Sequence, residues 1–319
     1  MILAADVGGS KTLVGVFTRA RPRPVLVEVR ELRTLDYAGL PALLDAAFGR
    51  RDPRITSISF GIAGPIVDGE VVMTNVPWRV SHREMVEATG VPQLRLLNDL
   101  EAMAWAVPVL AAHELHTLQA GTPNPAGNAA LIAAGTGLGE AILHRVDGRL
   151  LPVPSEAGHA DFAARTDEEL ALVRAIRDEV GRVDVERVVS GLGLVHIAAH
   201  RHGADRCAVA GVFGARDGVA RVSQAAAAGT CADCAAVMDL FVDAYGAEAG
   251  NLALRAMATA GLYVGGGIAP KIRPLLERRF MASFLDKAPM APLMAAIPVH
   301  VILNDQAALL GAAVAALDM

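Results

Sequence analysis

The first third of the chain alternates short apolar runs with clusters of turn residues. Apolar runs predict strands over residues 2–5, 13–17, 55–62 and 94–97, and alternating valines predict another over 25–32. Residues 40–48 predict a helix, a short strand is expected over 70–74, and Ser81 to Glu84 forms a capping box for a helix that stops at Gly90. This order indicates an α/β domain with a mixed sheet and differs from the strict alternation of a dinucleotide fold.

The second half of the chain begins with the same plan as the first. Residues 129–134 predict a strand, Gly135 to Gly139 a turn, and Glu140 the start of the next strand. The loop over 119–128, rich in Gly, Pro and Asn, is a plausible domain edge. Further elements are expected as a helix over 234–257, a strand at 261–264 before three glycines, a strand over 299–303 and an apolar helix over 307–316.

Asn98 and Asp99 stand where the 94–97 strand gives way to a helical pattern. In open α/β sheets, ligands bind outside the carboxyl ends of strands, so a carboxylate there could take a proton from a substrate hydroxyl. Both residues are also good helix caps, and on this stretch alone the cap is the simpler interpretation.

Two glycine-rich turns are candidates for phosphate binding. The first, Asp6 to Thr12, contains adjacent glycines that expose backbone N–H groups, although it lacks the Walker spacing. A plain hairpin with Gly-Gly at its tip explains that turn equally well. The second, Gly135 to Gly139, repeats the plan, and two such turns could hold one nucleotide from both sides.

Other polar residues fall in loops or at helix ends. Glu156 and His159 lie in a loop bounded by Gly and Pro. Glu186 begins a segment, residues 186–193, that is expected to end one helix and start another. Such side chains can bind hydroxyl groups, but exposed loop and helix surfaces carry the same residues without any ligand.

Composition narrows the function classes. With 53% apolar and 20% charged residues, a net charge of −5 and no basic stripe, the chain lacks a nucleic-acid footprint. Its mean hydropathy is +0.39, yet no unbroken apolar run is long enough to span a bilayer, and the N-terminus does not read as a signal peptide, so a cytoplasmic protein without a membrane partner is expected.

The three cysteines do not indicate a disulfide scaffold. Cys231 and Cys234 form a C-x-x-C that, with Cys207 and His202, could supply four zinc ligands. The spacing fits no usual zinc motif, so we expect no structural zinc, and we place Cys234 on an apolar helix face with Met238, Phe241 and Tyr245.

Seven segments in order carry a family signature: DVGGSKT (6–12), MTNVPW (73–78), LNDLEA (97–102), AAGTGLG (133–139), SEAGHADF (155–162), ERVVSG (186–191) and VGGGIAP (264–270). The chain resembles the bacterial glucokinases outside the ROK group, in the hexokinase, actin and heat-shock ATPase superfamily. The resemblance implies a two-domain α/β, actin-like ATPase (ribonuclease H-like) fold with a cleft between the domains. The small domain would comprise residues 1–108 and 302–319, and the large domain 109–301.

The resemblance implies phosphorylation of the glucose 6-hydroxyl by ATP with Mg²⁺, in a homodimer. Because a kinase must keep water from the phosphoryl group, we expect hexose binding to close the two domains. Asp99 would be the catalytic base. The sugar ligands would be Asn98, Glu156, His159, Glu186 and Gly137. The nucleotide side would comprise Asp6, Gly8, Gly9, Ser10, Lys11, Thr12, Gly135, Thr136, Gly265 and Gly266. No metal would be held directly by the protein, although Asp6 could hold Mg²⁺ through water.

Two residues depart from the family pattern. Lys11 stands where many members have Asn, and Ala157 replaces a commoner Gly beside Glu156. Lys11 could touch a phosphate or face solvent. Ala157 could shift Glu156 slightly, which leaves the choice of hexose less defined than the reaction.

Two other functions compete with a sugar kinase. A sugar-sensing ROK regulator would need a helix-turn-helix before the first strand, and an actin-like or chaperone-like ATPase would lack the sugar set.

Overall fold

The structure is a computed structural model, and it describes residues 1–49, 52–73 and 76–319. Its contacts divide the chain into two compact units. The first comprises Met1–Glu114, Leu151–Pro154 and Asn304–Met319, and the second comprises Leu115–Leu150 and Ser155–Leu303. From the resemblance, the small domain was expected to comprise residues 1–108 and 302–319, close to the main parts of the first unit.

The first unit is built on a five-stranded sheet in the order β3-β2-β1-β4-β8. Antiparallel pairing joins β1 to β2 and β2 to β3, whereas β4 runs parallel to both β1 and β8. A separate small sheet has the order β5-β6-β7. The strands are β1 (Ile2–Val7), β2 (Lys11–Thr18), β3 (Val25–Arg33), β4 (Ser57–Ile62), β5 (Ile66–Val67), β6 (Glu70–Val72), β7 (Arg79–Ser81) and β8 (Leu94–Asn98).

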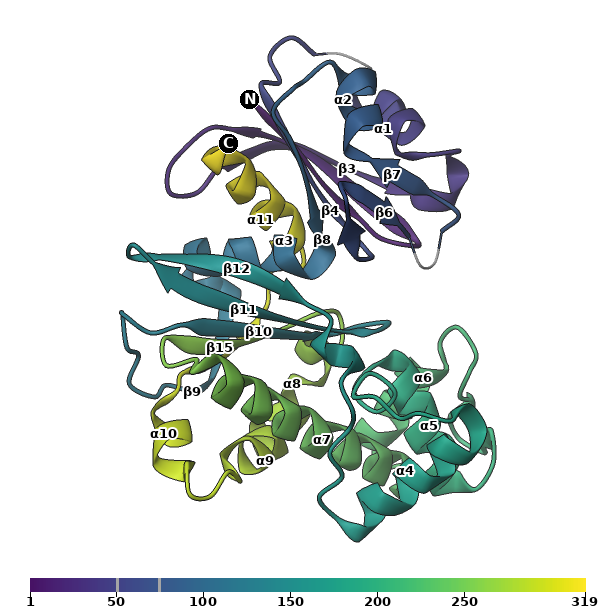
Figure 1. The fold of residues 1–319 in the computed structure, drawn as a ribbon. Coiled ribbons are helices and arrows are strands. Elements are labelled where there is room, and N and C mark those ends of the chain that lie inside the picture. The colour runs from purple at the N-terminus through teal and green to yellow at the C-terminus, as the bar shows by residue number, and fades with distance from the viewer. Residues whose placement is uncertain (50–51, 74–75) are drawn as a thin grey trace. The chain divides into compact units, whose positions relative to one another are not determined.

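Helices cover both faces of this sheet (Figure 1). The helices are α1 (Leu40–Phe48), α2 (His82–Thr89), α3 (Asp99–Ala106) and α11 (Ala307–Ala315), with 3₁₀ turns η1 (Thr34–Asp36), η2 (Val107–Val109), η3 (Ala112–Glu114) and η7 (Ala316–Asp318). Leu3 and Val7 join a core cluster with Leu40 and Leu43 of α1. On the other side, α11 packs so tightly on α3 that a β-carbon at Gly311 would overlap the Ala102 carbonyl. The small residues of both helices therefore permit the contact.

The second unit contains a six-stranded sheet in the order β12-β11-β10-β15-β16-β9. It repeats the first plan, because β10 pairs antiparallel with β11 and parallel with β15, as β1 does with β2 and β4. A two-stranded ribbon joins β13 to β14. The strands are β9 (Leu115–Gln119), β10 (Ala129–Ala134), β11 (Leu138–Val146), β12 (Arg149–Ser155), β13 (Arg206–Cys207), β14 (Gly211–Val212), β15 (Gly261–Gly265) and β16 (Val299–Ile302).

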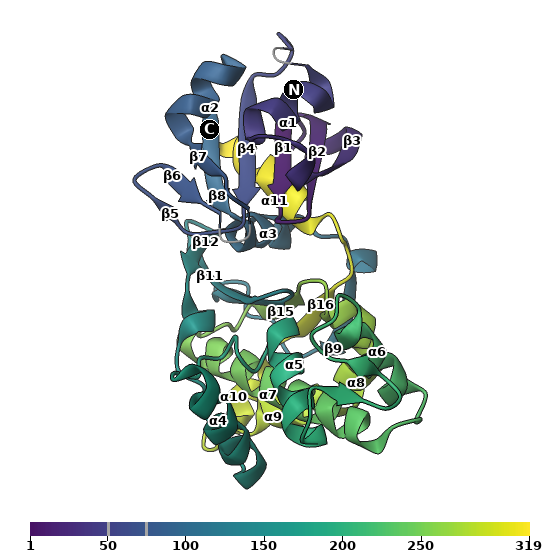
Figure 2. The ribbon, with the colours of Figure 1, turned by 90° about the vertical axis from the view of Figure 1, so that its right-hand side faces the viewer.

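One long helix, α7 (Ala232–Ala256), organises the core of the second unit, with the other helices gathered around it (Figure 2). The predicted apolar face is confirmed, since Cys234, Met238, Phe241 and Tyr245 have no exposed surface. The remaining helices are α4 (Asp167–Val180), α5 (Gly191–His202), α6 (Gly218–Ala227), α8 (Arg273–Leu275), α9 (Met281–Leu285) and α10 (Ala291–Ala296), with 3₁₀ turns η4 (Ala157–His159) and η5 (Ala269–Ile272) and a π-helical segment η6 (Leu276–Phe280).

Two local expectations are wrong, and a third is confirmed in part. Ser81 precedes α2, but its side chain makes no capping hydrogen bond. Residues 186–189 form turns instead of the end of a helix, since α4 already stops at Val180. The strand expected over 70–74 is described as Glu70–Val72, and residues 74 and 75 of the MTNVPW segment lie outside the described residues.

Within the described ranges, no single helix has both the length and the apolar composition needed to cross a membrane. One bent pair, Gly218–Ala227 with Ala232–Ala256, passes that test by length and composition only.

Candidate active site

The turn between β1 and β2 is exposed at its tip and supported from below. The Gly8 N–H donates to the Lys11 carbonyl at 3.1 Å, which closes the turn, and a β-carbon on Gly8 would lie only 2.9 Å from that carbonyl oxygen. The Thr34 hydroxyl donates to the Gly8 carbonyl at 2.8 Å, and the Thr34 N–H donates to the Ser10 carbonyl. Thr34 therefore fixes this turn, a role that no sequence pattern pointed to.

Two residues assigned to the nucleotide have other partners. Thr12 is fully buried, and its hydroxyl lies 2.9 Å from that of Thr34, so it shapes the turn and presents no surface to a ligand. This corrects the expectation that Thr12 contacts a nucleotide. The Lys11 ammonium lies 3.0 Å from the Glu31 carboxylate, and both side chains are exposed, so that surface pair is weak and leaves Lys11 able to change partner.

Asp6 and Asp99 lie at the same edge of the first sheet. β1 and β8 both run parallel to β4, so their carboxyl ends meet at one edge. Gly61 lies between them in the ladder, opposite Asp6 on one side and Leu97 on the other. A β-carbon at Gly61 would lie 2.6 Å from the Ala102 β-carbon, so glycine there lets α3 approach the strand.

The two carboxylates interact electrostatically. The pKa of Asp6 is raised to about 6. Burial is the main cause, the negative charge of Asp99 adds to it, and Lys11 partly opposes the rise. Raised carboxyl pKa values are common where two acids share a functional site, because the second negative charge is costly. The edge predicted from Asn98-Asp99 is therefore also where the Asp6 carboxylate is found.

Asn98 is a helix cap, as the simpler interpretation held. Its side-chain oxygen accepts the N–H groups of Leu100 at 2.9 Å and Glu101 at 3.4 Å. Its amide nitrogen donates to the Gly64 carbonyl at 3.2 Å, which leaves one amide hydrogen for another acceptor. The capping role holds the strand–helix junction and thereby fixes where Asp99 begins the helix.

In the second unit, the expected nucleotide-side glycines gather at the carboxyl ends of β10 and β15. Gly266 has a φ of +83°, and a β-carbon there would overlap the Ala134 carbonyl. Beneath them, the buried Tyr245 hydroxyl accepts the Ala134 N–H at 3.2 Å and donates to the Gly265 carbonyl at 3.4 Å. Tyr245 thus ties the two strand ends together, a role that its place on an apolar helix face did not suggest.

The Gly135–Gly137 turn lies against the start of α5. The Gly191 N–H donates to the Gly135 carbonyl at 2.8 Å, and the Gly135 N–H donates to the Gly137 carbonyl at 2.8 Å. Ser190 caps α5 by accepting the Gly193 N–H. A twelve-residue helix therefore begins beside the second glycine-rich turn, and helix N-termini favour anions.

The expected sugar-side residues of the second unit form a connected group. The Glu186 carboxylate accepts the Leu138 N–H at 2.9 Å, and the Glu186 N–H donates to the Gly158 carbonyl. A β-carbon at Gly137 would overlap that carboxylate. Glu156 begins the η4 turn, and its carbonyl accepts the His159 N–H at 3.0 Å. The structure thus brings Gly137, Glu186 and the η4 segment to one place.

His159 has a partner that the sequence did not identify. Its Nδ1 lies 3.2 Å from the carboxylate of Asp184, which is mostly buried, while the imidazole is about half exposed. If Nδ1 carries the proton toward Asp184, Nε2 is left as a hydrogen-bond acceptor. Asp184 orients His159 and also accepts the Arg187 N–H, so it organises this segment.

Comparison with known proteins gives one consistent family. Residues 3–319 match the family model described as Glucokinase. The glucokinase of Synechocystis sp. is 37% identical over 344 residues, spanning 98% of this chain and 97% of that protein. The crystal structure of a glucokinase from an Antarctic psychrotroph has a TM-score of 0.85 at 30% identity and covers 100% of this chain and 99% of that one.

A ROK family glucokinase from Streptomyces griseus, solved with glucose and AMPPNP, has a TM-score of 0.64 at 21% identity and covers 98% of this chain and 97% of that chain. At that identity the likeness concerns the fold alone. Together the neighbours confirm the expected α/β fold of the actin-like ATPase type.

Proposed function

The chain belongs to the glucokinase family, and from that membership we propose that it transfers the γ-phosphoryl group of ATP to the 6-hydroxyl of glucose, giving glucose 6-phosphate and ADP. The observation that most supports this assignment is the Asp99 carboxylate at the carboxyl edge of the first sheet, close enough to raise the pKa of Asp6. Membership supplies the reaction class, and this edge supplies a residue for its proton transfer.

We assign the role of general base to Asp99. Phosphoryl transfer requires little covalent chemistry from the protein, so catalysis depends mainly on placing the nucleophile and neutralising phosphate charge. A carboxylate within hydrogen-bond reach can take the hydroxyl proton as the oxygen–phosphorus bond forms. Asn98, which caps the same helix, retains an amide hydrogen that could bind a neighbouring sugar hydroxyl.

The sugar hydroxyls are assigned to Glu156, Glu186 and His159, with Gly137 approaching through its backbone. Glu186 uses one oxygen to accept the Leu138 N–H, so its other oxygen can accept a hydroxyl hydrogen. His159, oriented by Asp184, would accept a hydroxyl through Nε2. Glu186 and His159 are each held by a protein contact, which lowers the entropy cost of ordering them around a ligand.

The phosphates and adenosine are assigned to the glycine-rich segments. Gly8, Gly9 and Ser10 of the first turn and Gly135 and Thr136 of the second would present backbone N–H groups to phosphate oxygens. The steric limit at Gly266 keeps side chains away from the ends of β10 and β15, so a flat ring could approach the Gly265–Gly266 backbone.

Mg²⁺ would accompany ATP and neutralise phosphate charge. The donor set fits, because Mg²⁺ prefers carboxylate oxygens and keeps several waters, and Asp6 is a carboxylate beside a second acid. Asp6 would therefore hold the ion through a water. We also propose a homodimer in the cytoplasm from the family resemblance; light scattering of the eluted protein tests the dimer, and cell fractionation the location.

The test of the proposed reaction is ADP release measured with a panel of hexoses and without any sugar. The proposal predicts release that depends on hexose and is matched by formation of glucose 6-phosphate when glucose is supplied. ADP release at the same rate without sugar would instead indicate an ATPase of the actin or chaperone type. Binding of hexose without ADP release would indicate a sugar-sensing protein.

A further inference from the structure

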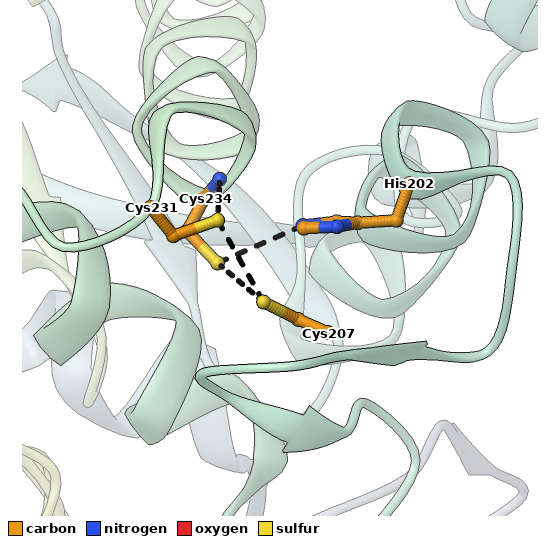
Figure 3. A group of neighbouring side chains, drawn as sticks. All are labelled: His202, Cys207, Cys231 and Cys234. Carbon is orange, nitrogen blue, oxygen red and sulfur yellow. Dashed lines mark hydrogen bonds between the residues drawn. The ribbon is translucent and has the colours of Figure 1, made fainter.

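Three cysteines and a histidine from two separate stretches of the chain, residues 202–207 and 231–234, meet in the second unit (Figure 3). His202 ends α5, Cys207 lies in β13, Cys231 is the N-cap of α7, and Cys234 lies in the first turn of that helix. Cys207 and Cys234 are buried, and the other two are partly exposed. The cluster therefore joins two helices and the β13–β14 ribbon at one point.

The distances between the ligand atoms match a tetrahedral metal site. With zinc–sulfur bonds of about 2.3 Å, the sulfurs at two corners of a tetrahedron lie about 3.8 Å apart. The Cys207 and Cys231 sulfurs are 3.6 Å apart, and those of Cys207 and Cys234 are 3.8 Å apart. The Cys234 sulfur is 3.7 Å from His202 Nε2, and all four atoms lie within 4.8 Å of one another.

The backbone around the cluster is arranged to stabilise negative sulfur atoms. The Val209 N–H donates to the Cys207 sulfur at 3.3 Å, and the Cys234 N–H donates to the Cys231 sulfur at 3.4 Å. Cys231 also stands at the N-terminus of a 25-residue helix, where the helix dipole favours an anion. Metal-bound cysteines are thiolates, so these contacts suit ligation.

We propose that His202, Cys207, Cys231 and Cys234 bind one zinc ion in a closed structural site. The sequence-based expectation of no zinc rested on spacing, and the fold removes that objection: H-x₄-C and C-x₂-C are two short-range pairs that the chain brings together. Three cysteines and one histidine fill all four positions, which is typical of a structural site and leaves none open for substrate.

A disulfide is the competing interpretation. It would join only two of the three sulfurs and would give no role to the third or to His202, whose Nε2 lies close to Cys234. Metal binding uses all four groups. It would clamp the end of α5, and the opposite end of that helix contacts Gly135 through Gly191. The ion would thus stabilise the support of the second glycine-rich turn.

The test is elemental analysis of untagged protein, purified under reducing conditions from zinc-supplemented medium. Wild type should carry about one zinc per chain. The variants Cys207→Ser and His202→Asn should bind zinc more weakly. Removing a residue that only hydrogen-bonds to a metal ligand typically costs roughly 10–100-fold in affinity, so losing a ligand itself should cost at least as much. His200→Asn is the matched control, because it changes a histidine on the same helix outside the cluster, and it should keep its zinc.

A measurement on wild type makes the test independent of variant folding. Chelation should lower the melting temperature, and adding Zn²⁺ alone should restore it, because binding free energy adds to folding free energy. Co²⁺ in place of zinc should give the visible absorption of a tetrahedral thiolate site.

Three results would overturn the proposal. In the first, the wild-type protein holds less than one-tenth of a zinc per chain after incubation with Zn²⁺. In the second, Cys207→Ser keeps its zinc. In the third, the intact mass of protein that was kept reduced during purification shows a disulfide.

Discussion

Replacing Gly137 with alanine tests the proposed sugar-side geometry. A β-carbon at this position would overlap the Glu186 carboxylate, so that carboxylate must move and lose its 2.9 Å hydrogen bond from the Leu138 N–H. A hydrogen bond to a charged group contributes about 1.5–3 kcal/mol. If the displaced carboxylate binds the sugar in the transition state, kcat/KM for glucose should fall about 10- to 150-fold.

The assay is steady-state kinetics with glucose varied at saturating ATP, and then ATP varied at saturating glucose. The loss should appear in kcat/KM for glucose, with KM for ATP little changed. Gly214→Ala is the control, because its β-carbon would meet no atom within 4 Å. Unchanged kcat/KM for glucose in folded Gly137→Ala would refute the assignment of Glu186 as a sugar ligand held by this contact.

Three further predictions concern single carboxylates. Glu156→Ala should raise KM for hexose far more than KM for ATP, and the reverse pattern in steady-state kinetics would contradict its assignment. Burial and Glu248 raise the pKa of the buried Glu140, so the folded state keeps a proton that the unfolded state releases. Unfolding free energy should therefore fall as pH rises above 4.5, and Glu140→Gln should flatten that slope in urea titrations. Hydrogen bonds from Arg23 lower the pKa of Glu114 to about 2 in the folded state. The ionised carboxylate therefore stabilises the folded protein above pH 4.5, and this stabilisation is lost as the pH falls toward 2. Glu114→Gln should remove that acid-dependent loss from melting curves measured at low pH.

Strand and turn positions could be predicted because their signals are local. The runs around residues 2–5, 13–17 and 129–134 combine apolar residues with glycine at the turns, and the structure has β1, β2 and β10 there. The repeated plan was also visible, since β1–β2 and β10–β11 pair in the same way. Asn98 and Asp99 were correctly located at a strand–helix junction.

Contacts between distant segments could not be predicted from patterns. Thr34 follows a strand with no unusual sequence feature, yet its hydroxyl donates to the Gly8 carbonyl and lies within hydrogen-bond distance of the Thr12 hydroxyl. Asp184 has no motif of its own and is recognised only through its contact with His159. The four-residue cysteine and histidine cluster was judged by spacing along the chain, whereas its ligand atoms come together only when α5 and α7 pack.

A second Asn-Asp pair, Asn304-Asp305, precedes the last helix. Asp305 is exposed, and the side chain of Asn304 accepts the Gln306 N–H at 2.8 Å. Asn304 also donates to Glu114 at 2.6 Å, a partner far away in sequence. Asp305 is therefore a surface carboxylate without a capping role, and it remains a matched control for Asp99.

The central claim is that Asp99 is the base of a hexose kinase, and turnover of Asp99→Asn tests it most directly. The substitution keeps the shape of the side chain and removes its ability to take a proton, a loss that typically costs about 10²–10⁴-fold in rate. The account predicts a fall of that size in kcat, with ATP binding and melting temperature close to wild type and Asp305→Asn nearly unaffected. Near-normal turnover in folded Asp99→Asn would contradict it and leave Asp99 as the first residue of a capped helix.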